Sequence, residues 1–237
     1  MSAHVLMLSS SRKGSENYLE HALTYLYAHL GEARKLLFVS FAGVSVSWDD
    51  YTAKVADALP DFEVAGLHQQ ADPVAAIQQA QAKGQAIVVG GGNTFNLLHN
   101  LYAQQLTEPL KQAIANGTPY IGWSAGSNIC GRTICTTNDM PVIQPASFDA
   151  LAVLPCQLNP HYNNYTPPGH NGETRDERLN EFCILNPHTP ILAIPEGSAL
   201  SYCHGELKYL GDDEGYVFVG QTKQAIQPTA VLNQYLT

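Results

Sequence analysis

Basic residues are scarce in this chain of 237 residues, which has 12 lysines and arginines against 21 aspartates and glutamates. The formal net charge is −9, and no block of basic residues interrupts the sequence. Proteins that hold a nucleic-acid backbone neutralise its phosphates with clustered lysine and arginine side chains. The charge balance therefore argues against a nucleic-acid partner.

Long apolar runs and paired cysteines are also missing. No run approaches the roughly 20 residues that cross a bilayer, and HVLML near the amino terminus is too short for the core of a signal segment. The five cysteines are odd in number and form no C-x-x-C pair, which fits reduced thiols better than disulfides. We therefore expect no membrane partner and a cytoplasmic location.

Hydrophobic residues make up 45% of the chain, enough to bury a full core. Apolar runs of the strand type alternate with helical patterns, and several of these runs are apolar at almost every position. Such strands, when separated by helices, predict a mostly parallel sheet with helices on both faces. With no internal repeat and no linker in the sequence, we expect a single α/β domain over residues 1–237.

Local signals predict some details of this fold. Asp72 before Pro73 is typical of an N-cap followed by the first helical residue, and Gly117 is typical of a helix end. Near the carboxyl end, ELKYLG and GYVFVG predict a hairpin. Residues 138–174 break the alternation, are rich in proline, asparagine and glycine, and have the character of a long functional connection.

The stretch PYIGWSAGSN, residues 119–128, places Ser124 at the end of a strand-like run inside a G-x-S-x-G pattern. A strand, a sharp turn and a helix around this pattern form a nucleophile elbow, which presents the serine hydroxyl above the end of the strand. Glycines are needed there because side chains two residues from the serine would collide with neighbouring backbone. The pattern predicts Ser124 as a nucleophile; the alternative is a small residue in a tight turn.

A serine nucleophile needs a general base, and the base needs a carboxylate that orients it. Of the nine histidines, His161 and His170 lie in the irregular segment after the serine and are candidates for substrate chemistry. Glu196 closes an apolar strand, where a charged residue is otherwise out of place. Asp139 is the rival acid, and the residues alone leave both acids open.

An oxyanion formed during attack by the serine needs two N–H donors. Ala125 directly follows the serine and supplies one, and the glycine run that ends at Gly92 supplies the other because it lets the backbone approach a ligand closely. That run lacks the spacing and the lysine of phosphate-binding loops. Without H-E-x-x-H or a cysteine pair, the sequence predicts no metal site, and we expect no cofactor.

Six blocks of the sequence resemble the peptidase E family of α-aspartyl dipeptidases, in the same order as in that family and with similar spacing between them: GGGNTFNLL, GWSAGSN, TTNDMP, LNPHY, PPGHNGETR and IPEGSAL. The resemblance implies a serine peptidase with a three-layer α/β sandwich like that of class I glutamine amidotransferases. It also implies hydrolysis of small dipeptides that begin with aspartate. In this reading Ser124 is the nucleophile, His161 the base and Glu196 the third member, with Asp139 as the alternative acid.

The same resemblance implies that Arg175 holds the carboxylate of the substrate's aspartate side chain. A guanidinium group suits this because it can bind a carboxylate with two parallel hydrogen bonds. Arg175 could instead be an arginine on the face of a helix, although Arg178 fits that description better. His170, close by in a glycine-containing loop, is a candidate for a substrate contact; the alternative is that it stabilises the loop.

Two other functions stay open at this point. One is a cyanophycinase-like enzyme or another exopeptidase on the same fold. The other is a binding module of the amidotransferase type whose serine is inert. The combined presence of Ser124, His161 and Glu196 favours an enzyme over the binding module.

Overall fold

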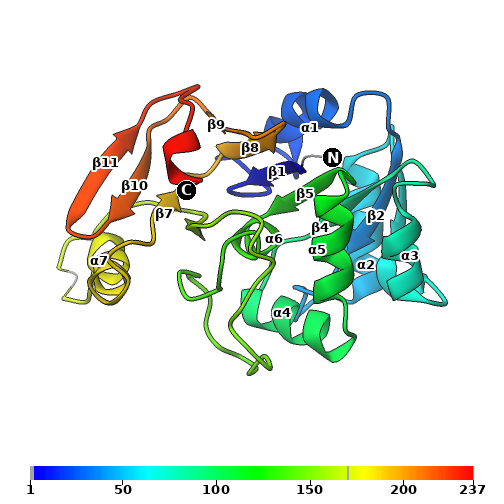
Figure 1. Ribbon diagram of the computed structural model, residues 1–237, viewed down its shortest axis with the longest axis horizontal. Coiled ribbons are helices and arrows are strands. Elements are labelled where there is room, and N and C mark those ends of the chain that lie inside the picture. The colour runs from blue at the N-terminus through cyan, green and yellow to red at the C-terminus, as the bar shows by residue number, and fades with distance from the viewer. Residues whose placement is uncertain (1–2, 170, 237) are drawn as a thin grey trace.

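The structure is a computed structural model that describes residues 3–169 and 171–236. Its described residues form a seven-stranded sheet in the order β3-β2-β4-β5-β1-β8-β9 and a four-stranded sheet in the order β11-β10-β7-β6 (Figure 1). The strands are β1 (His4–Leu8), β2 (Lys35–Val39), β3 (Glu63–Gly66), β4 (Gln85–Val89), β5 (Tyr120–Trp123), β6 (Gln157–Asn159), β7 (Ile191–Ala193), β8 (Ala199–Cys203), β9 (Glu206–Leu210), β10 (Gly215–Val219) and β11 (Thr222–Ile226).

Helices follow most of the strands of the larger sheet. They are α1 (Leu23–Leu30), α2 (Trp48–Ala58), α3 (Pro73–Gln79), α4 (Thr94–Ala103), α5 (Thr107–Ala115), α6 (Ala125–Asn128) and α7 (Arg175–Leu185), with short 3₁₀ turns η1 (Glu20–Ala22), η2 (Leu67–Gln69) and η3 (Asn233–Tyr235). Asp72 caps α3 as predicted, since its side chain accepts a hydrogen bond from the Ala75 N–H at 2.9 Å. No helix in the described ranges is both long enough and apolar enough to cross a membrane.

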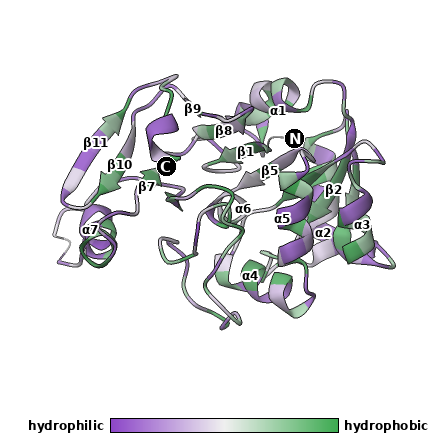
Figure 2. Ribbon diagram, viewed as in Figure 1, coloured by the Kyte–Doolittle hydropathy of each residue, from purple (hydrophilic) through white to green (hydrophobic). Residues whose placement is uncertain are grey.

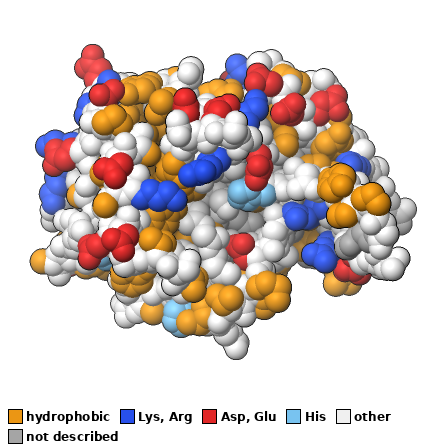
Figure 3. Space-filling model, turned by 180° about the vertical axis from the view of Figure 1, so that it is seen from behind, with side chains coloured by type: hydrophobic (Ala, Val, Ile, Leu, Met, Phe, Trp, Pro, Cys, Tyr) orange, Lys and Arg blue, Asp and Glu red, His pale blue; other side chains and the backbone are white. Residues whose placement is uncertain are grey.

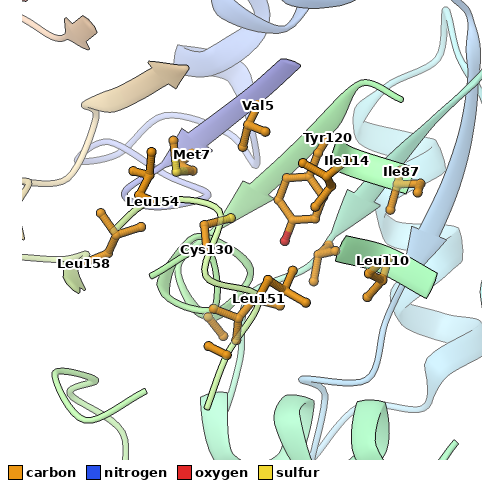
Figure 4. Packing of buried hydrophobic residues seen from close by; sticks show 14 of the residues in the cluster. Val5, Met7, Ile87, Leu110, Ile114, Tyr120, Cys130, Leu151, Leu154 and Leu158 are labelled. Atoms are coloured by element: carbon orange, nitrogen blue, oxygen red, sulfur yellow. The ribbon is translucent and has the colours of Figure 1, made fainter. Parts of the chain in front are cut away.

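Strands β1 to β5 pair in parallel, and β8 and β9 extend the sheet in the antiparallel direction. Alternate side chains of β1 point to opposite faces. Leu6 and Leu8 pack in a cluster with residues of α1 and α2, whereas Val5 and Met7 pack with residues of α3, α4 and α5 (Figure 4). The predicted fold, a mostly parallel sheet with helices on both faces, is confirmed.

Hydropathy along the chain follows these layers. The central strands are largely hydrophobic, whereas helices such as α3 and α5 alternate between hydrophilic and hydrophobic residues (Figure 2). This is the pattern expected when a sheet is buried on both faces and each helix buries one stripe. Whether the whole chain is one domain stays a prediction.

The predicted hairpin of ELKYLG with GYVFVG is wrong. Strand β9 pairs with β8, and β10 pairs with β11 in the smaller sheet. The reason is local: His204 and Gly205, between β8 and β9, have φ values of 53° and 80°. Two consecutive positive φ values form the tight turn that suits a two-residue hairpin, so β9 folds back on the strand before it.

The smaller sheet contains a parallel pair that matters for the site. Strands β6 and β7 are aligned with Asn159 opposite Ala193. His161 follows β6 by two residues and Glu196 follows β7 by three. Because the carboxyl ends of parallel strands lie at the same edge of a sheet, the two side chains are brought together.

Candidate active site

Ser124 sits at a sharp turn between β5 and α6, with φ 53° and ψ −112°. A Cβ atom on Gly122 would collide with the carbonyl oxygen of Gly126, and one on Gly126 would collide with the carbonyl oxygen of Val89. The predicted reason for glycine two residues before and after the serine is therefore confirmed. The turn has the geometry of a nucleophile elbow.

The end of β1 anchors this turn. The Ser124 N–H donates to the carbonyl oxygen of Leu8 at 3.2 Å. The buried Ser127 hydroxyl lies 2.6 Å from the same oxygen and 2.9 Å from the carbonyl oxygen of Gly122. A positive φ is strained in a residue that has a side chain, and these hydrogen bonds hold Ser124 in that conformation.

The Ser124 hydroxyl is hydrogen-bonded to His161, which in turn contacts a carboxylate. Ser124 Oγ lies 2.8 Å from His161 Nε2, and His161 Nδ1 lies 2.8 Å from Glu196 Oε1. A carboxylate can only accept at this distance, so Nδ1 carries the proton and the lone pair of Nε2 faces the serine. This arrangement can remove the proton of the serine hydroxyl and stabilise the imidazolium that results.

Two serines that follow β1 hold the loops carrying His161 and Glu196. The His161 N–H donates to Ser9 Oγ at 2.8 Å, and that hydroxyl donates to the carbonyl oxygen of Ile194 at 2.9 Å. The N–H of Gly197, next to Glu196, donates to Ser10 Oγ at 3.1 Å. The sequence reasoning missed both serines, although three serines directly after an apolar strand were a polar signal at a strand end.

Asp139, the rival acid, contacts other groups. One of its carboxylate oxygens accepts from the Thr94 N–H at 2.7 Å, from Thr94 Oγ1 at 2.6 Å and from Thr137 Oγ1 at 3.2 Å. Thr94 is the first residue of α4, so the Asp139 carboxylate lies at the N-terminus of this helix, where negative charge is stabilised. Asp139 also lines a small cleft of about 20 Å³ together with Ser124 and Ala125.

The glycine run after β4 lies against the serine. A Cβ atom on Gly91 would come within 2.9 Å of Ser124 Cβ, and Gly92 has φ 137°. The buried Tyr51 hydroxyl accepts from Trp123 Nε1 at 3.2 Å and donates to the carbonyl oxygen of Gly91 at 2.9 Å. In a trans peptide the carbonyl and the next N–H point in opposite directions, so the Gly92 N–H points away from Tyr51.

A cavity of about 540 Å³ opens beside the serine, and its lining includes Ser124, His161, Gly91 and Gly92. The space-filling view shows a hollow around a histidine side chain, with lysine or arginine side chains on both sides of it (Figure 3). The cavity is large enough for a group well beyond the reacting atoms to lie next to the serine.

Arg175 begins α7 and lies in a different hollow, of about 180 Å³, which Thr137 and Asp139 also line. Its Nη1 is buried without a hydrogen-bond partner among the described residues. Burial, and then the charge of Arg178, lower the pKa of Arg175. Buried charged groups are normally paired, so an unpaired guanidinium nitrogen beside this hollow is a candidate for binding an anion.

Among the predicted site residues, the structure brings together Ser124, His161 and Glu196 by hydrogen bonds, and Gly92 and Ala125 line hollows beside the serine. Arg175 does not line either of those hollows; residues 137–139 line both its own hollow and the small cleft at Ser124. His170 lies outside the described residues.

The fold and the site together have the form of an α/β serine hydrolase, and comparison with known proteins agrees. Residues 5–210 match the model of Peptidase family S51. Peptidase E of Shewanella putrefaciens (strain CN-32 / ATCC BAA-453) is 48% identical over 230 residues, which cover 96% of each chain. Peptidase E of Shewanella sp. (strain ANA-3) is 49% identical over 226 residues, 94% of each chain.

A solved structure is similar over the same extent. The crystal structure of a peptidase from an acI-B1 actinobacterium has a TM-score of 0.66 at 18% identity and covers 98% of this chain and 97% of its own. The chain therefore belongs to peptidase family S51. It is a peptidase, its substrates are peptides, and the predicted relationship to peptidase E is confirmed at the level of the family.

Proposed function

We propose that this peptidase hydrolyses dipeptides that begin with aspartate, with Ser124 as nucleophile, His161 as general base and Glu196 as the group that orients it. The observation that carries the proposal is the chain of two 2.8 Å hydrogen bonds from Ser124 Oγ through His161 to Glu196. A structural serine in a tight turn would need no imidazole at its hydroxyl, and an imidazole would need no carboxylate behind it.

The reaction follows from these positions. His161 Nε2 takes the proton of Ser124 as the serine oxygen attacks the peptide carbonyl, and the N–H groups of Ala125 and Gly92 hold the oxyanion. His161 then donates the proton to the leaving amine. A water molecule, deprotonated by His161, releases aspartate from the ester and restores the serine. Glu196 stays ionised throughout and stabilises the imidazolium.

The preference for aspartate rests on Arg175. A chain with net charge −9 needs local positive charge to accept a second carboxylate near the scissile bond. Arg175 offers a buried nitrogen with no partner among the described residues. Residues 137–139 line both its hollow and the small cleft beside Ser124, so the aspartate side chain of the substrate would lie along these residues, between the serine and Arg175.

Replacement of Arg175 by alanine tests the substrate class. We expect kcat/KM for Asp-Leu to fall about 100-fold, because a desolvated charge-assisted pair is lost, while Ala-Leu stays a poor substrate for both proteins. The measurement is the hydrolysis of a panel of Asp-X, Glu-X, Ala-X and β-linked aspartyl dipeptides. The same panel distinguishes Asp-X hydrolysis from a cyanophycinase-like activity. Arg178→Ala is the matched control, since Arg178 already lies 3.6 Å from Glu173 and should show a much smaller loss. A variant at Arg175 that keeps the preference for Asp-Leu over Ala-Leu would disprove this assignment.

Tyr51 is expected to position the oxyanion donor. In Tyr51→Phe the carbonyl of Gly91 loses the hydroxyl that holds it, so the Gly92 N–H is less well aligned. We expect kcat on Asp-Leu to fall about tenfold with little change in KM, less than the 100- to 1000-fold cost of removing a donor. Tyr102→Phe is the control, because the Tyr102 hydroxyl also donates to a backbone carbonyl, that of Asp149 at 2.9 Å, away from the cavity. Equal kcat in the two variants would contradict the expectation.

A further inference from the structure

The cavity beside Ser124 has a lining that the reacting atoms alone do not explain. Besides Ser124 and His161 it is lined by Tyr18, by residues 42–46 of the loop after β2 and by Lys54 of α2. The serine attacks a single carbonyl carbon, so most of the volume of about 540 Å³ is available to another part of the substrate. The chemistry of its walls indicates which part that is.

Lys54 is the one lysine or arginine among the described residues that line this cavity, and none of those residues is an aspartate or glutamate. Its Nζ lies 4.2 Å from the centroid of the Tyr18 ring. No carboxylate in the described ranges forms an ion pair with it. An aromatic face orients an ammonium group without neutralising it, so the charge of Lys54 remains available to an anion.

The two unpaired cations lie in different hollows. Lys54 lines the large cavity with Ser124, whereas Arg175 lines the hollow beyond residues 137–139. An ionised Asp-X dipeptide carries one carboxylate on each side of its scissile bond: the aspartate side chain before it and the terminal carboxylate after it. The separation of the two cations by the serine matches this distribution of charge.

We infer that Lys54 binds the terminal carboxylate of the substrate, so that the leaving residue occupies the large cavity. The inference rests on the proposed function and adds the direction in which the substrate lies. It also supplies a reason for cleavage of dipeptides rather than longer chains, because a further peptide bond would replace the carboxylate at Lys54 with a neutral group.

Apolar residues that line the same cavity favour an apolar side chain on the leaving residue. Val44, Val46 and Val142 line the cavity with 63%, 37% and 59% of their surface exposed. Covering exposed apolar surface is favourable in proportion to the area removed from water. The leaving residue is therefore preferentially apolar, as in Asp-Leu, and Asp-Asp is a poorer substrate than Asp-Leu.

The test compares Asp-Leu with Asp-Leu-amide, which differ only in the terminal charge. For the unmodified protein we expect kcat/KM to be at least about tenfold higher for the free acid. In Lys54→Gln this ratio falls toward one, mainly through a higher KM for the acid, and Lys54→Arg retains most of the ratio. Lys83→Gln, at an exposed position outside the cavity lining, is the matched control and keeps the ratio of the unmodified protein.

The outcomes separate this inference from the proposed function. If the unmodified protein cleaves Asp-Leu and Asp-Leu-amide equally well, or if Lys54→Gln keeps the ratio of the unmodified protein, the assignment of Lys54 is overturned while the proposed function stands. If the unmodified protein cleaves no Asp-X dipeptide, the proposed function fails and the inference fails with it. Inhibition by free leucine gives a second measurement: its inhibition constant is expected to rise about tenfold in Lys54→Gln.

Discussion

Ser124→Ala is expected to lower kcat for Asp-X hydrolysis by roughly 10⁴-fold or more, the scale on which serine hydrolases respond to loss of the nucleophile. The reason is that no other hydroxyl contacts His161 Nε2 among the described residues, and Ser124 Oγ does so at 2.8 Å. The folded structure should survive, because the N–H of Ser124, which bonds to Leu8, is kept and only the hydroxyl is removed.

Covalent labelling by a fluorophosphonate probe checks the same prediction independently of the substrate. The unmodified protein and Ser15→Ala, a change at an exposed serine outside the site, should be labelled, and Ser124→Ala should not. Turnover of Ser124→Ala within tenfold of normal would end the nucleophile assignment. Failure of the folded, unmodified protein to react with the probe would favour a binding module with an inert serine.

Glu196→Gln is expected to lower kcat by roughly 10²- to 10⁴-fold, whereas Asp139→Asn should have a much smaller effect on kcat. An amide is similar in shape to the carboxylate of Glu196, but it neither holds the Nδ1 proton in place as strongly nor stabilises the imidazolium. The Asp139 carboxylate accepts hydrogen bonds from Thr94 and Thr137, whereas His161 bonds to Glu196.

The two acids are separated by measuring kcat and thermal unfolding for both variants. Asp139→Asn weakens a bond to the first N–H of α4 and should lower the melting temperature more than it lowers kcat. Glu196→Gln should lower kcat strongly and the melting temperature little, because the Glu196 side chain is 56% exposed. If Asp139→Asn proves as damaging to kcat as Glu196→Gln, Glu196 is not the sole orienting acid.

Both residues that meet in the site have a strained backbone. Ser124 and His161 have φ values of 53° and 55°, which cost free energy in a residue with a side chain. Both are held from the end of β1, Ser124 through the carbonyl of Leu8 and His161 through the hydroxyl of Ser9. One buried strand thus fixes the distance between nucleophile and base, although the two lie 37 residues apart in the chain.

Local features of the sequence were enough to predict the parallel sheet, the elbow and the cap at Asp72. The helical periodicity between the apolar runs and the pair Asp72-Pro73 act through contacts within a few residues, and Gly122 is required by the carbonyl of Gly126, four residues on. The structure agrees with these signals, whereas Gly126 itself is required by the carbonyl of Val89 on a neighbouring strand. The hairpin was predicted wrongly because two adjacent turns competed, and the positive φ values at His204 and Gly205 decided between them.

The residue types of the site follow from local patterns: a serine on an elbow, two candidate acids and a histidine in a long connection. Only the tertiary structure placed Glu196 rather than Asp139 at His161, because that contact depends on the parallel pairing of β6 with β7. It likewise brought Lys54 to the cavity of Ser124. Such contacts join residues far apart in the chain, and their free energy comes from burying whole strands and helices together, which no local pattern encodes.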